Sequence, residues 1–198
     1  MNELRIITGH GSIDLLNPTP DDVNMVDVCL NLSRIRRWNG AIDFTVGQHS
    51  RLVEAILKAN GANQATCLAG LLHDAHEYAT GDVPGPVLKT CYIYELKGLY
   101  YQSIPLKSVQ TNIQNAIHNV CRLATSDVNW NAVDAADMEA RACEVWYLLP
   151  QSAPRRNLID TQFQTEPDEP TARNFDAILN GNGSLAEHLA AYGISVEL

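Results

Sequence analysis

Apolar residues recur at intervals of three and four along most of this chain, which is the spacing of a helix with one buried face. These stripes predict helices over about residues 21–37, 46–59, 62–79, 87–124 and 128–149, the fourth with a break near Pro105. Shorter helices are expected near 173–179 and 184–192.

The first residues follow a different pattern. Two short apolar-rich segments within residues 4–16 flank Gly9-His10-Gly11, a turn-forming triplet, and predict a β-hairpin. The whole pattern therefore predicts an all-α bundle with a small N-terminal β-hairpin.

A length of 198 residues is most simply one domain with a sizeable core. Within it we expect a hairpin over 1–20, a helical core over 21–149, and a loop with C-terminal helices over 150–198. Residues 150–172 are polar and hold four prolines, so they predict a surface loop, of the kind that often serves as a lid or an oligomer contact.

Composition narrows the function. A net charge of −9 argues against binding to a nucleic acid polymer, although a few arginines or a metal can still bind a small phosphorylated substrate. Five scattered cysteines without a CxxC pair are typical of buried thiols in a reducing cytosol. The chain shows no signal-peptide pattern and no apolar run near the ~18 residues of a membrane span. We therefore expect a cytoplasmic protein with no membrane partner.

Chemistry concentrates in the stretch His73-Asp74-Ala75-His76-Glu77, which follows an apolar run that should bury it. Burying so many ionisable groups is expensive unless they are paired or bind a metal. The order of residues fits neither HExxH nor HxxEH, and no paired cysteines support a zinc finger. An adjacent His-Asp pair remains, whose side chains suit Zn²⁺, Mn²⁺, Co²⁺ or Fe²⁺.

Two ligands hold a metal weakly, so others must come from elsewhere in the chain. His49 lies early in the helix before the cluster, and Asp134 and Asp137 lie three residues apart in a later helix with small neighbours. The spacing alone leaves the choice between the two aspartates open.

Taken together, His49, His73-Asp74 and Asp137 resemble the H…HD…D signature of the HD-domain phosphohydrolases. The likeness is closest to the nucleotide phosphohydrolases of about 200 residues from bacteria and bacteriophages. It extends over residues 1 to about 145, through the opening hairpin and the segments 15–18, 32–40, 44–50, 72–86 and 136–137.

The resemblance implies an HD-domain helical bundle and a ligand set of His49, His73, Asp74 and Asp137, with Asp137 chosen over Asp134. One divalent transition metal, Zn²⁺, Co²⁺ or Mn²⁺, would bind there, and a second divalent ion is expected on the substrate phosphates. The metal would acidify water and neutralise charge on the phosphoryl group.

The resemblance also suggests two catalytic residues. Glu77 lies one helical turn beyond His73 and would act as general base or acid. Asp82 would reach the substrate near the sugar and the scissile phosphate.

The resemblance also implies that residues before and after the cluster bind the substrate, since Arg37 and Trp38 match the family's pair of an arginine and an aromatic residue. Arg37 would clamp phosphate and Trp38 would pack on the sugar or base, where an indole can exclude a ribose 2′-hydroxyl. Arg34 is expected to assist with phosphate. Lys89 resembles a lysine after the D-x-P-x-P loop, with Leu88 as one extra residue, and His76 is either a substrate contact or a structural histidine.

The resemblance therefore implies a metal-dependent hydrolase of deoxynucleotides. The expected reaction releases a deoxynucleoside and triphosphate from a dNTP, with dATP favoured by resemblance to the phage enzymes. The alternatives are a 5′-deoxynucleotidase acting on dNMPs, a regulator that binds nucleotides without turnover, and a purely structural metal protein. Homo-oligomers, dimers or hexamers, are expected from the family, in the cytosol of a bacterium or a phage-infected host.

Overall fold

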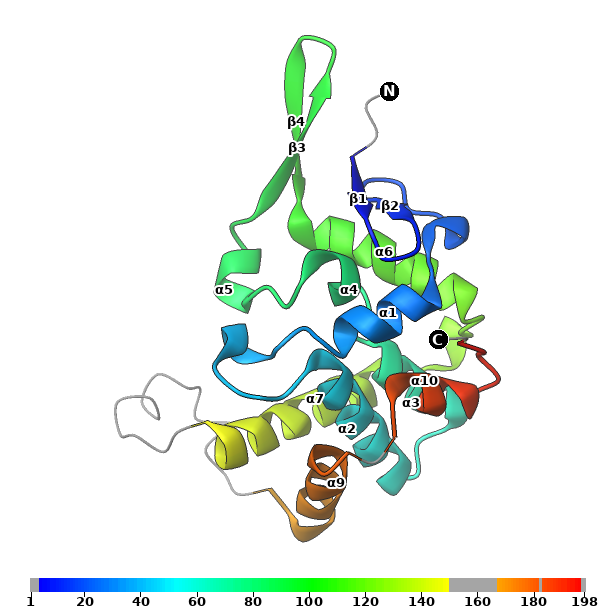
Figure 1. The fold of residues 1–198 in the computed structure, drawn as a ribbon, viewed down its shortest axis with the longest axis vertical. Helices are drawn as coiled ribbons and strands as arrows, with labels where there is room; N and C mark the ends of the chain where they lie inside the picture. Colours follow the sequence, from blue (N-terminus) through cyan, green and yellow to red (C-terminus); the bar gives the residue numbers. More distant parts are fainter. Residues whose placement is uncertain (1–3, 150–166, 182, 197–198) are drawn as a thin grey trace.

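The structure is a computed structural model that describes residues 4–149, 167–181 and 183–196. It is mainly helical with a short N-terminal hairpin, which confirms the helical bundle with a small hairpin predicted above (Figure 1). In that hairpin β1 (Arg5–Ile7) pairs antiparallel with β2 (Ser12–Asp14), and Ile13 is fully buried. None of the helices in the described ranges has the length and apolar character that crossing a membrane requires.

The α-helices form the body of the molecule, in which α2 packs against α3, α7 and α9 (Figure 1). In chain order they are α1 (Met25–Leu32), α2 (Val46–Ala59), α3 (Gln64–Leu72), α4 (Glu77–Thr80), α5 (Gly85–Leu88), α6 (Leu106–Val120), α7 (Trp130–Cys143), α9 (Glu169–Leu179) and α10 (Leu185–Ala190). Short 3-10 turns cover Pro20–Asp22, Trp38–Gly40 and Thr125–Asp127, and a π-helical turn, Glu144–Leu148, extends α7.

Polar side chains fix where the main helices begin. The Thr45 hydroxyl accepts a hydrogen bond from Gln48 N at 3.1 Å, and the Gln48 side chain accepts one from Thr45 N at 2.8 Å, which is a capping box for α2. Asn63 caps α3 and Asn129 caps α7 in the same position. These three helices carry the candidate site, so the caps help to set the register of its side chains.

Two predicted helices are shorter than expected. The first ends at Leu32 rather than near Arg37, because the chain turns away and Arg36 forms a β-bridge with Thr45. The helix predicted over 62–79 is divided into α3 and α4. At the division Ala75 N bonds to Leu72 O and Glu77 N to Asp74 O, three residues back rather than four.

The helix predicted over 87–124 is wrong for residues 92–105, which form a second antiparallel hairpin. Its strands are β3 (Tyr92–Lys97) and β4 (Tyr100–Pro105), and Figure 1 shows them projecting from the helical body. Gly98 supplies the positive φ, +65°, that the first position of a two-residue hairpin turn needs. Aromatic and β-branched residues favour strands, and here they outweigh the weak helical spacing.

The C-terminal helices are close to those predicted. α9 begins at Glu169, four residues before the predicted Arg173, because Asp168 caps it by accepting a hydrogen bond from Thr171 N at 2.9 Å. Part of the predicted 150–172 loop is therefore helical, and its residues 150–166 lie outside the described residues. α10 falls within the predicted 184–192 segment.

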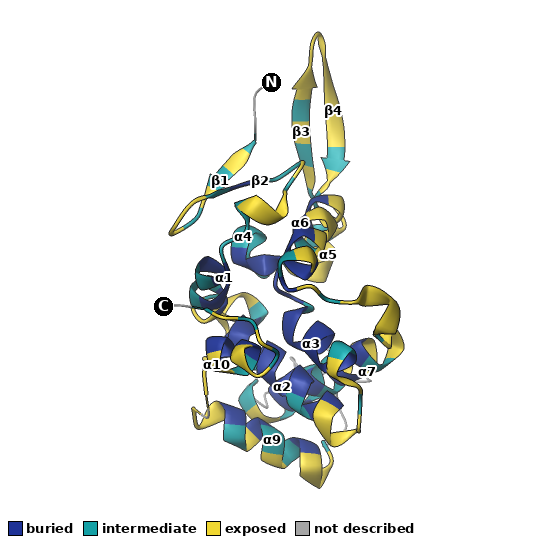
Figure 2. Cartoon of the chain, turned by 90° about the vertical axis from the view of Figure 1, so that its right-hand side faces the viewer, coloured by how far each residue is buried: buried dark blue, intermediate teal, exposed yellow. Residues whose placement is uncertain are grey.

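Two groups of buried apolar side chains form the core (Figure 2). One lies among α1, α3, α6 and α10, and the other among α2, α7 and α9. In the second group the rings of Phe44 and Phe175 lie 5.5 Å apart. Each large side chain buried in this way contributes about 1.5–3 kcal/mol to stability. The helices α2, α3 and α7, which carry the predicted ligands, are therefore held rigidly together.

Candidate functional site

The four predicted ligands lie together where α2, α3 and α7 meet. His49 Nε2 is 2.9 Å from Asp137 Oδ1, 3.2 Å from His73 Nε2 and 3.7 Å from Asp74 Oδ2. His73 Nε2 is 3.2 Å from Asp74 Oδ2 and 3.7 Å from Asp137 Oδ1. Residues separated by up to 88 positions in the sequence thus present ligand atoms to one small volume.

This donor set fits a divalent ion. Ligand atoms about 2.1 Å from a common centre, at angles between octahedral and tetrahedral, lie about 3.0–3.4 Å apart. The five separations that involve His49 or His73, from 2.9 to 3.7 Å, bracket that range. His49, His73 and Asp74 in particular form a group whose ligand atoms all lie within 4.8 Å of one another.

Hydrogen bonds orient both imidazoles toward this volume. His49 Nδ1 lies 2.6 Å from Glu144 Oε1, and His73 Nδ1 lies 2.8 Å from Gly70 O. A carbonyl and an ionised carboxylate only accept hydrogen bonds, so each Nδ1 carries a proton, and in the neutral ring the lone pair is on Nε2. Ligating histidines are commonly held in this way.

Glu144 was not predicted from the sequence, yet it connects the ligands to the pocket. Its side chain is fully buried and also accepts hydrogen bonds from Trp38 Nε1 at 2.5 Å and Arg37 Nε at 3.3 Å. Burial raises its pKa, but Arg37 and His49 outweigh this effect and hold the pKa below its ordinary value. Glu144 is therefore an ionised carboxylate that receives donors from three site residues.

Arg141 was also missed by the sequence prediction. It forms a bidentate ion pair with Asp137, with Nε 2.9 Å from Oδ1 and Nη2 2.7 Å from Oδ2. Asp137, Arg141 and Glu144 are spaced i, i+4 and i+7, so they share one face of α7. That spacing of charged residues, in a segment otherwise rich in alanine, is a signal by which both residues could have been found.

The charges around the ligands favour a cation. Burial raises the pKa of Asp74, but the positive charges of His73 and Arg37 lower it by more. The pKa of Asp74 therefore lies well below its ordinary value. Asp137 is shifted in the same direction, against the effect of burial, by its contacts with His49 and His73. Burial lowers the pKa of His73, and Asp74 and Asp137 outweigh it and raise the pKa. Both carboxylates are thus ionised at neutral pH.

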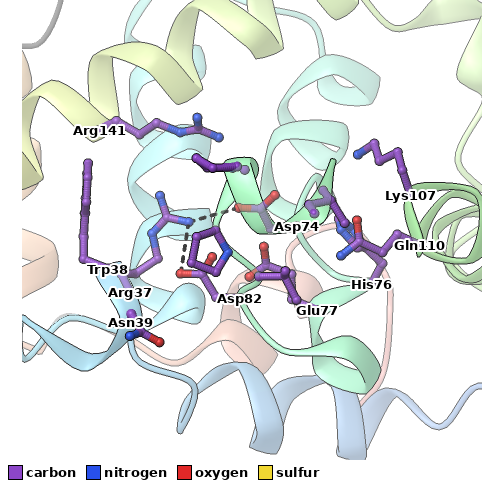
Figure 3. A pocket seen from close by; sticks show the side chains of 15 residues that line it. Arg37, Trp38, Asn39, Asp74, His76, Glu77, Asp82, Lys107, Gln110 and Arg141 are labelled. Atoms are coloured by element: carbon purple, nitrogen blue, oxygen red, sulfur yellow. Dashed lines mark hydrogen bonds and ion pairs between the residues drawn. The ribbon is translucent and has the colours of Figure 1, made fainter. Parts of the chain in front are cut away.

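A cavity of about 350 Å³ opens beside Asp74, within the size range of small-molecule sites (Figure 3). The predicted residues Arg37, Trp38, His76, Glu77 and Asp82 all line it. So do Asn39, Lys107, Gln110 and Arg141, which the sequence did not single out. Arg34 and Lys89, which were predicted to bind the substrate, are exposed, and neither is among the described residues that line this cavity.

Glu77 is a buried acid in this cavity. Its Oε2 has no hydrogen-bond partner among the described residues. Burial, together with the nearby charges of Asp74 and Asp82, raises the pKa of Glu77 to about 10. A carboxyl group with a displaced pKa in a cleft is a characteristic of catalytic acids and bases.

Contacts with neighbouring residues hold the side chains of Arg37 and Trp38 in one position. The Arg37 guanidinium is almost fully buried, with Nη1 3.4 Å from Asp74 Oδ2 and 4.0 Å from Asp82 Oδ2 (Figure 3). Trp38 has φ +56°, in the left-handed region that costs a non-glycine residue about 1–2 kcal/mol. The hydrogen bond to Glu144 and the packing of the loop offset this strain.

His76 separates this cavity from a second one of about 340 Å³, and Lys107 and Gln110 line both. The Gln114 side-chain oxygen accepts a hydrogen bond from His76 N and lies 3.1 Å from His76 Nδ1. Burial lowers the pKa of His76. No aspartate or glutamate is among the described residues that line the second cavity.

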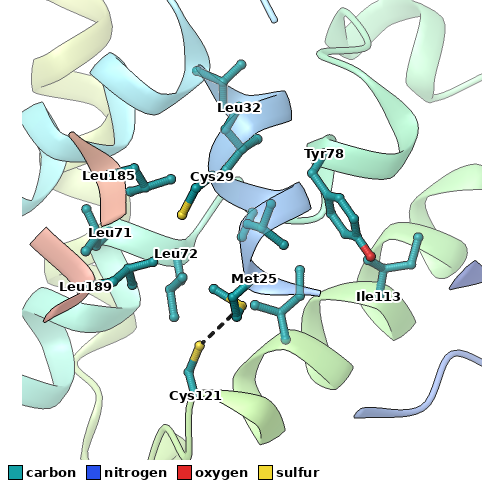
Figure 4. Packing of buried hydrophobic residues seen from close by; sticks show 14 of the residues in the cluster. Met25, Cys29, Leu32, Leu71, Leu72, Tyr78, Ile113, Cys121, Leu185 and Leu189 are labelled. Atoms are coloured by element: carbon teal, nitrogen blue, oxygen red, sulfur yellow. Dashed lines mark hydrogen bonds between the residues drawn. The ribbon is translucent and has the colours of Figure 1, made fainter. Parts of the chain in front are cut away.

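The core positions the turn that carries His73 and Asp74. Leu71 and Leu72, at the end of α3, are fully buried against α1 and α10, where they meet Cys29, Leu185 and Leu189 (Figure 4). Any displacement of the turn would open this packed cluster. The ligands therefore sit on a rigid support.

Comparison with known proteins gives little beyond this geometry. No family model matches the chain. An uncharacterized protein of Rhodobacter capsulatus is 42% identical over 89 residues, which is 42% of this chain and 45% of that protein. The match thus spans less than half of the length of that relative.

Proposed function

We propose that this protein is a metal-dependent phosphohydrolase of the HD-domain class that acts on deoxynucleotides. The observation that carries the proposal is the convergence of His49, His73, Asp74 and Asp137 beside a cavity that contains a buried acid and several cations. An ion in that position would polarise a phosphoryl oxygen and acidify water.

The side chains of the cavity have separate tasks in the proposed reaction. Water attacks the α-phosphorus, the P–O5′ bond breaks, and the 5′ oxygen takes up a proton. Glu77 accepts the proton from the attacking water or, in its protonated form, donates one to the departing oxygen. Asp82 and Trp38 bind the sugar, and Arg37 compensates phosphate charge. Release of a deoxynucleoside and triphosphate from a dNTP, dATP first, is the proposed outcome.

Two observations favour a triphosphate over a monophosphate. Lys107 forms no salt bridge among the described residues and faces both cavities. The second cavity begins at His73 and has no carboxylate among its described lining residues, although the chain has a net charge of −9. A polyphosphate can extend into such a space without repulsion.

A 5′-deoxynucleotidase acting on dNMPs is the second candidate. The cavity beside Trp38 is at the lower end of the usual range of ligand-site volumes, which favours a small substrate.

A cytoplasmic location is part of the proposed function for either substrate, since the five cysteines are all free thiols.

One assay separates these candidates. The protein is loaded with Mn²⁺ or Co²⁺ and offered dNTPs, dNMPs and ribonucleotides, and the released phosphate species are identified. Triphosphate from dNTPs supports the first candidate and orthophosphate from dNMPs the second. If the metal-loaded protein binds nucleotides tightly and releases no products, the protein is a nucleotide-binding regulator and the proposed hydrolase activity is refuted.

Variants test the role of Glu77 in the same assay. We expect Glu77→Gln to keep its metal and lose turnover by about 100-fold or more. Glu169→Gln, at an exposed carboxylate on α9, should retain full activity. Full activity of Glu77→Gln would refute the proton-transfer role.

A further inference from the structure

The β3–β4 hairpin turns an apolar face toward solvent. In its register Tyr94 lies opposite Ser103 and Leu96 opposite Tyr101, and residues directly opposite one another point to the same side of a sheet. Tyr92 is on this side too, opposite Pro105. The exposed fractions are 48% for Tyr92, 63% for Tyr94, 55% for Leu96 and 69% for Tyr101. We call these four residues the tyrosine face.

The opposite side of the hairpin is different in kind. Near the base, Ile93 and Ile104 pack against the core cluster of α1, α3 and α6. Nearer the tip lie Glu95 and Lys97, which form an ion pair at 2.6 Å. The only charged side chains of the two strands are thus on this side, while the side pointing away from the core has none.

A two-stranded hairpin with an exposed apolar face is expected to pack against a partner. A two-stranded sheet is marginally stable in water and normally presents its polar side to solvent. Here both outer strand edges are unpaired among the described residues, and the yellow, exposed positions run along both strands (Figure 2). An uncovered apolar patch of this extent usually marks an interaction surface.

We propose that the tyrosine face is the contact between two copies of this chain. Two copies related by a two-fold axis would place the same uncharged face on each side, as isologous dimers do. Each copy carries a net charge of −9, so a contact without charges lets the acidic bodies stay apart on either side of the paired hairpins.

The size of the face fits a modest dimer. A whole aromatic side chain has an area of about 150–250 Å². With the exposed fractions given above, the four side chains together expose about 400–500 Å² per copy. With the fully exposed Leu99 at the tip and the strand backbones, the pair approaches the roughly 1,200 Å² at which stable interfaces begin. We therefore expect a dissociation constant in the micromolar range.

Pairing of the hairpins would also act on the candidate site. β4 leads directly into α6, whose Lys107 and Gln110 line the cavity. A partner that fixes β4 would steady that edge of the cavity.

The test compares matched substitutions on the two faces of one hairpin. Tyr94 and Tyr100 are equally exposed, at 63% and 66%, but Tyr100 lies opposite Lys97 on the other side. Sedimentation equilibrium of the full chain should show a monomer–dimer equilibrium. Tyr94→Lys should weaken it by about tenfold or more, and Tyr100→Lys by less than about twofold.

Several outcomes would overturn the proposal. They are a wild-type chain that stays monomeric up to ~100 µM, a dimer equally affected by both substitutions, or a dimer unaffected by either. Unchanged circular dichroism and melting temperature of both variants exclude misfolding. Binding of the wild type, as a monomer, to phosphatidylcholine vesicles would assign the face to lipid instead.

Discussion

At the scale of single residues, Glu144 joins the two functions of the candidate site. One carboxylate oxygen receives the Nδ1 proton of His49, and the other receives donors from Trp38 and Arg37. The side chain that orients a ligand thus also orients two residues of the nucleotide cavity. Both groups of contacts are lost together if the carboxylate is removed.

We expect Glu144→Gln to lower the affinity for divalent metal by about 10- to 100-fold, because His49 loses a charged acceptor for Nδ1. Competition against a chromophoric chelator measures this directly, without reference to activity. Asp134→Asn is the control, since Asp134 is exposed on the same helix. An unchanged affinity in Glu144→Gln would show that His49 needs no such support.

His118 offers a test through pH. Burial, with a smaller effect of His76, lowers its pKa from 6.5 to about 4, so the folded protein keeps it neutral. Between these values the unfolded chain binds more protons, and stability must fall as the pH falls from about 6.5 to about 4.

In His118→Gln this part of the pH dependence should disappear. The Gln side chain can still accept the hydrogen bond that Gln114 Nε2 donates to His118 Nε2 at 2.7 Å. From urea titrations at pH 7.5 and pH 4.5, we expect the wild type to lose about 1–2 kcal/mol more than the variant. Equal losses would mean that His118 titrates normally.

At the scale of elements, close contact between α2 and α3 sets the position of the ligands. A Cβ on Gly70 would lie 2.2 Å from Leu57 Cδ1 and 3.2 Å from Val53 Cγ1, both on buried side chains of α2. The carbonyl of the same glycine receives the Nδ1 proton of His73. A glycine is thus required where α3 approaches α2 and turns toward the site.

Gly70→Ala should therefore destabilise the protein by about 1–3 kcal/mol, since Leu57 must move within a packed core. Denaturant unfolding gives the value. Gly85→Ala is the matched control, because a Cβ there meets nothing within 4 Å, and we expect little change or a slight gain. A neutral Gly70→Ala would show that the two helices can separate at no cost.

At the scale of the whole molecule, the sequence predicted most of the helices and the grouping of four distant residues. Helical spacing and caps are local signals. The four-residue ligand set came from the resemblance to the H…HD…D signature, since the spacing alone left Asp134 and Asp137 open. Glu144 and Lys107 were missed because Glu144 meets His49, and Lys107 reaches the cavity, only after the helices fold against one another. Arg141 binds Asp137 within α7, at a spacing that the sequence does show. Arg34 and Lys89 were placed by analogy of position, and both side chains point to solvent outside the described cavity.

The second hairpin was missed for a different reason. Its strands alternate between a side that contacts the core and the tyrosine face, so apolar residues occur on both sides and no clear period remains. The signal was the glycine of a two-residue turn between two aromatic-rich segments.

We propose that His49, His73, Asp74 and Asp137 together hold one divalent ion. Metal content per chain after dialysis against Mn²⁺ or Zn²⁺, by native mass spectrometry, tests it most directly. We expect about one ion per chain in the wild type and in Asp134→Asn, and little in Asp137→Asn. A wild type without metal, or equal loading of the two aspartate variants, would contradict the account.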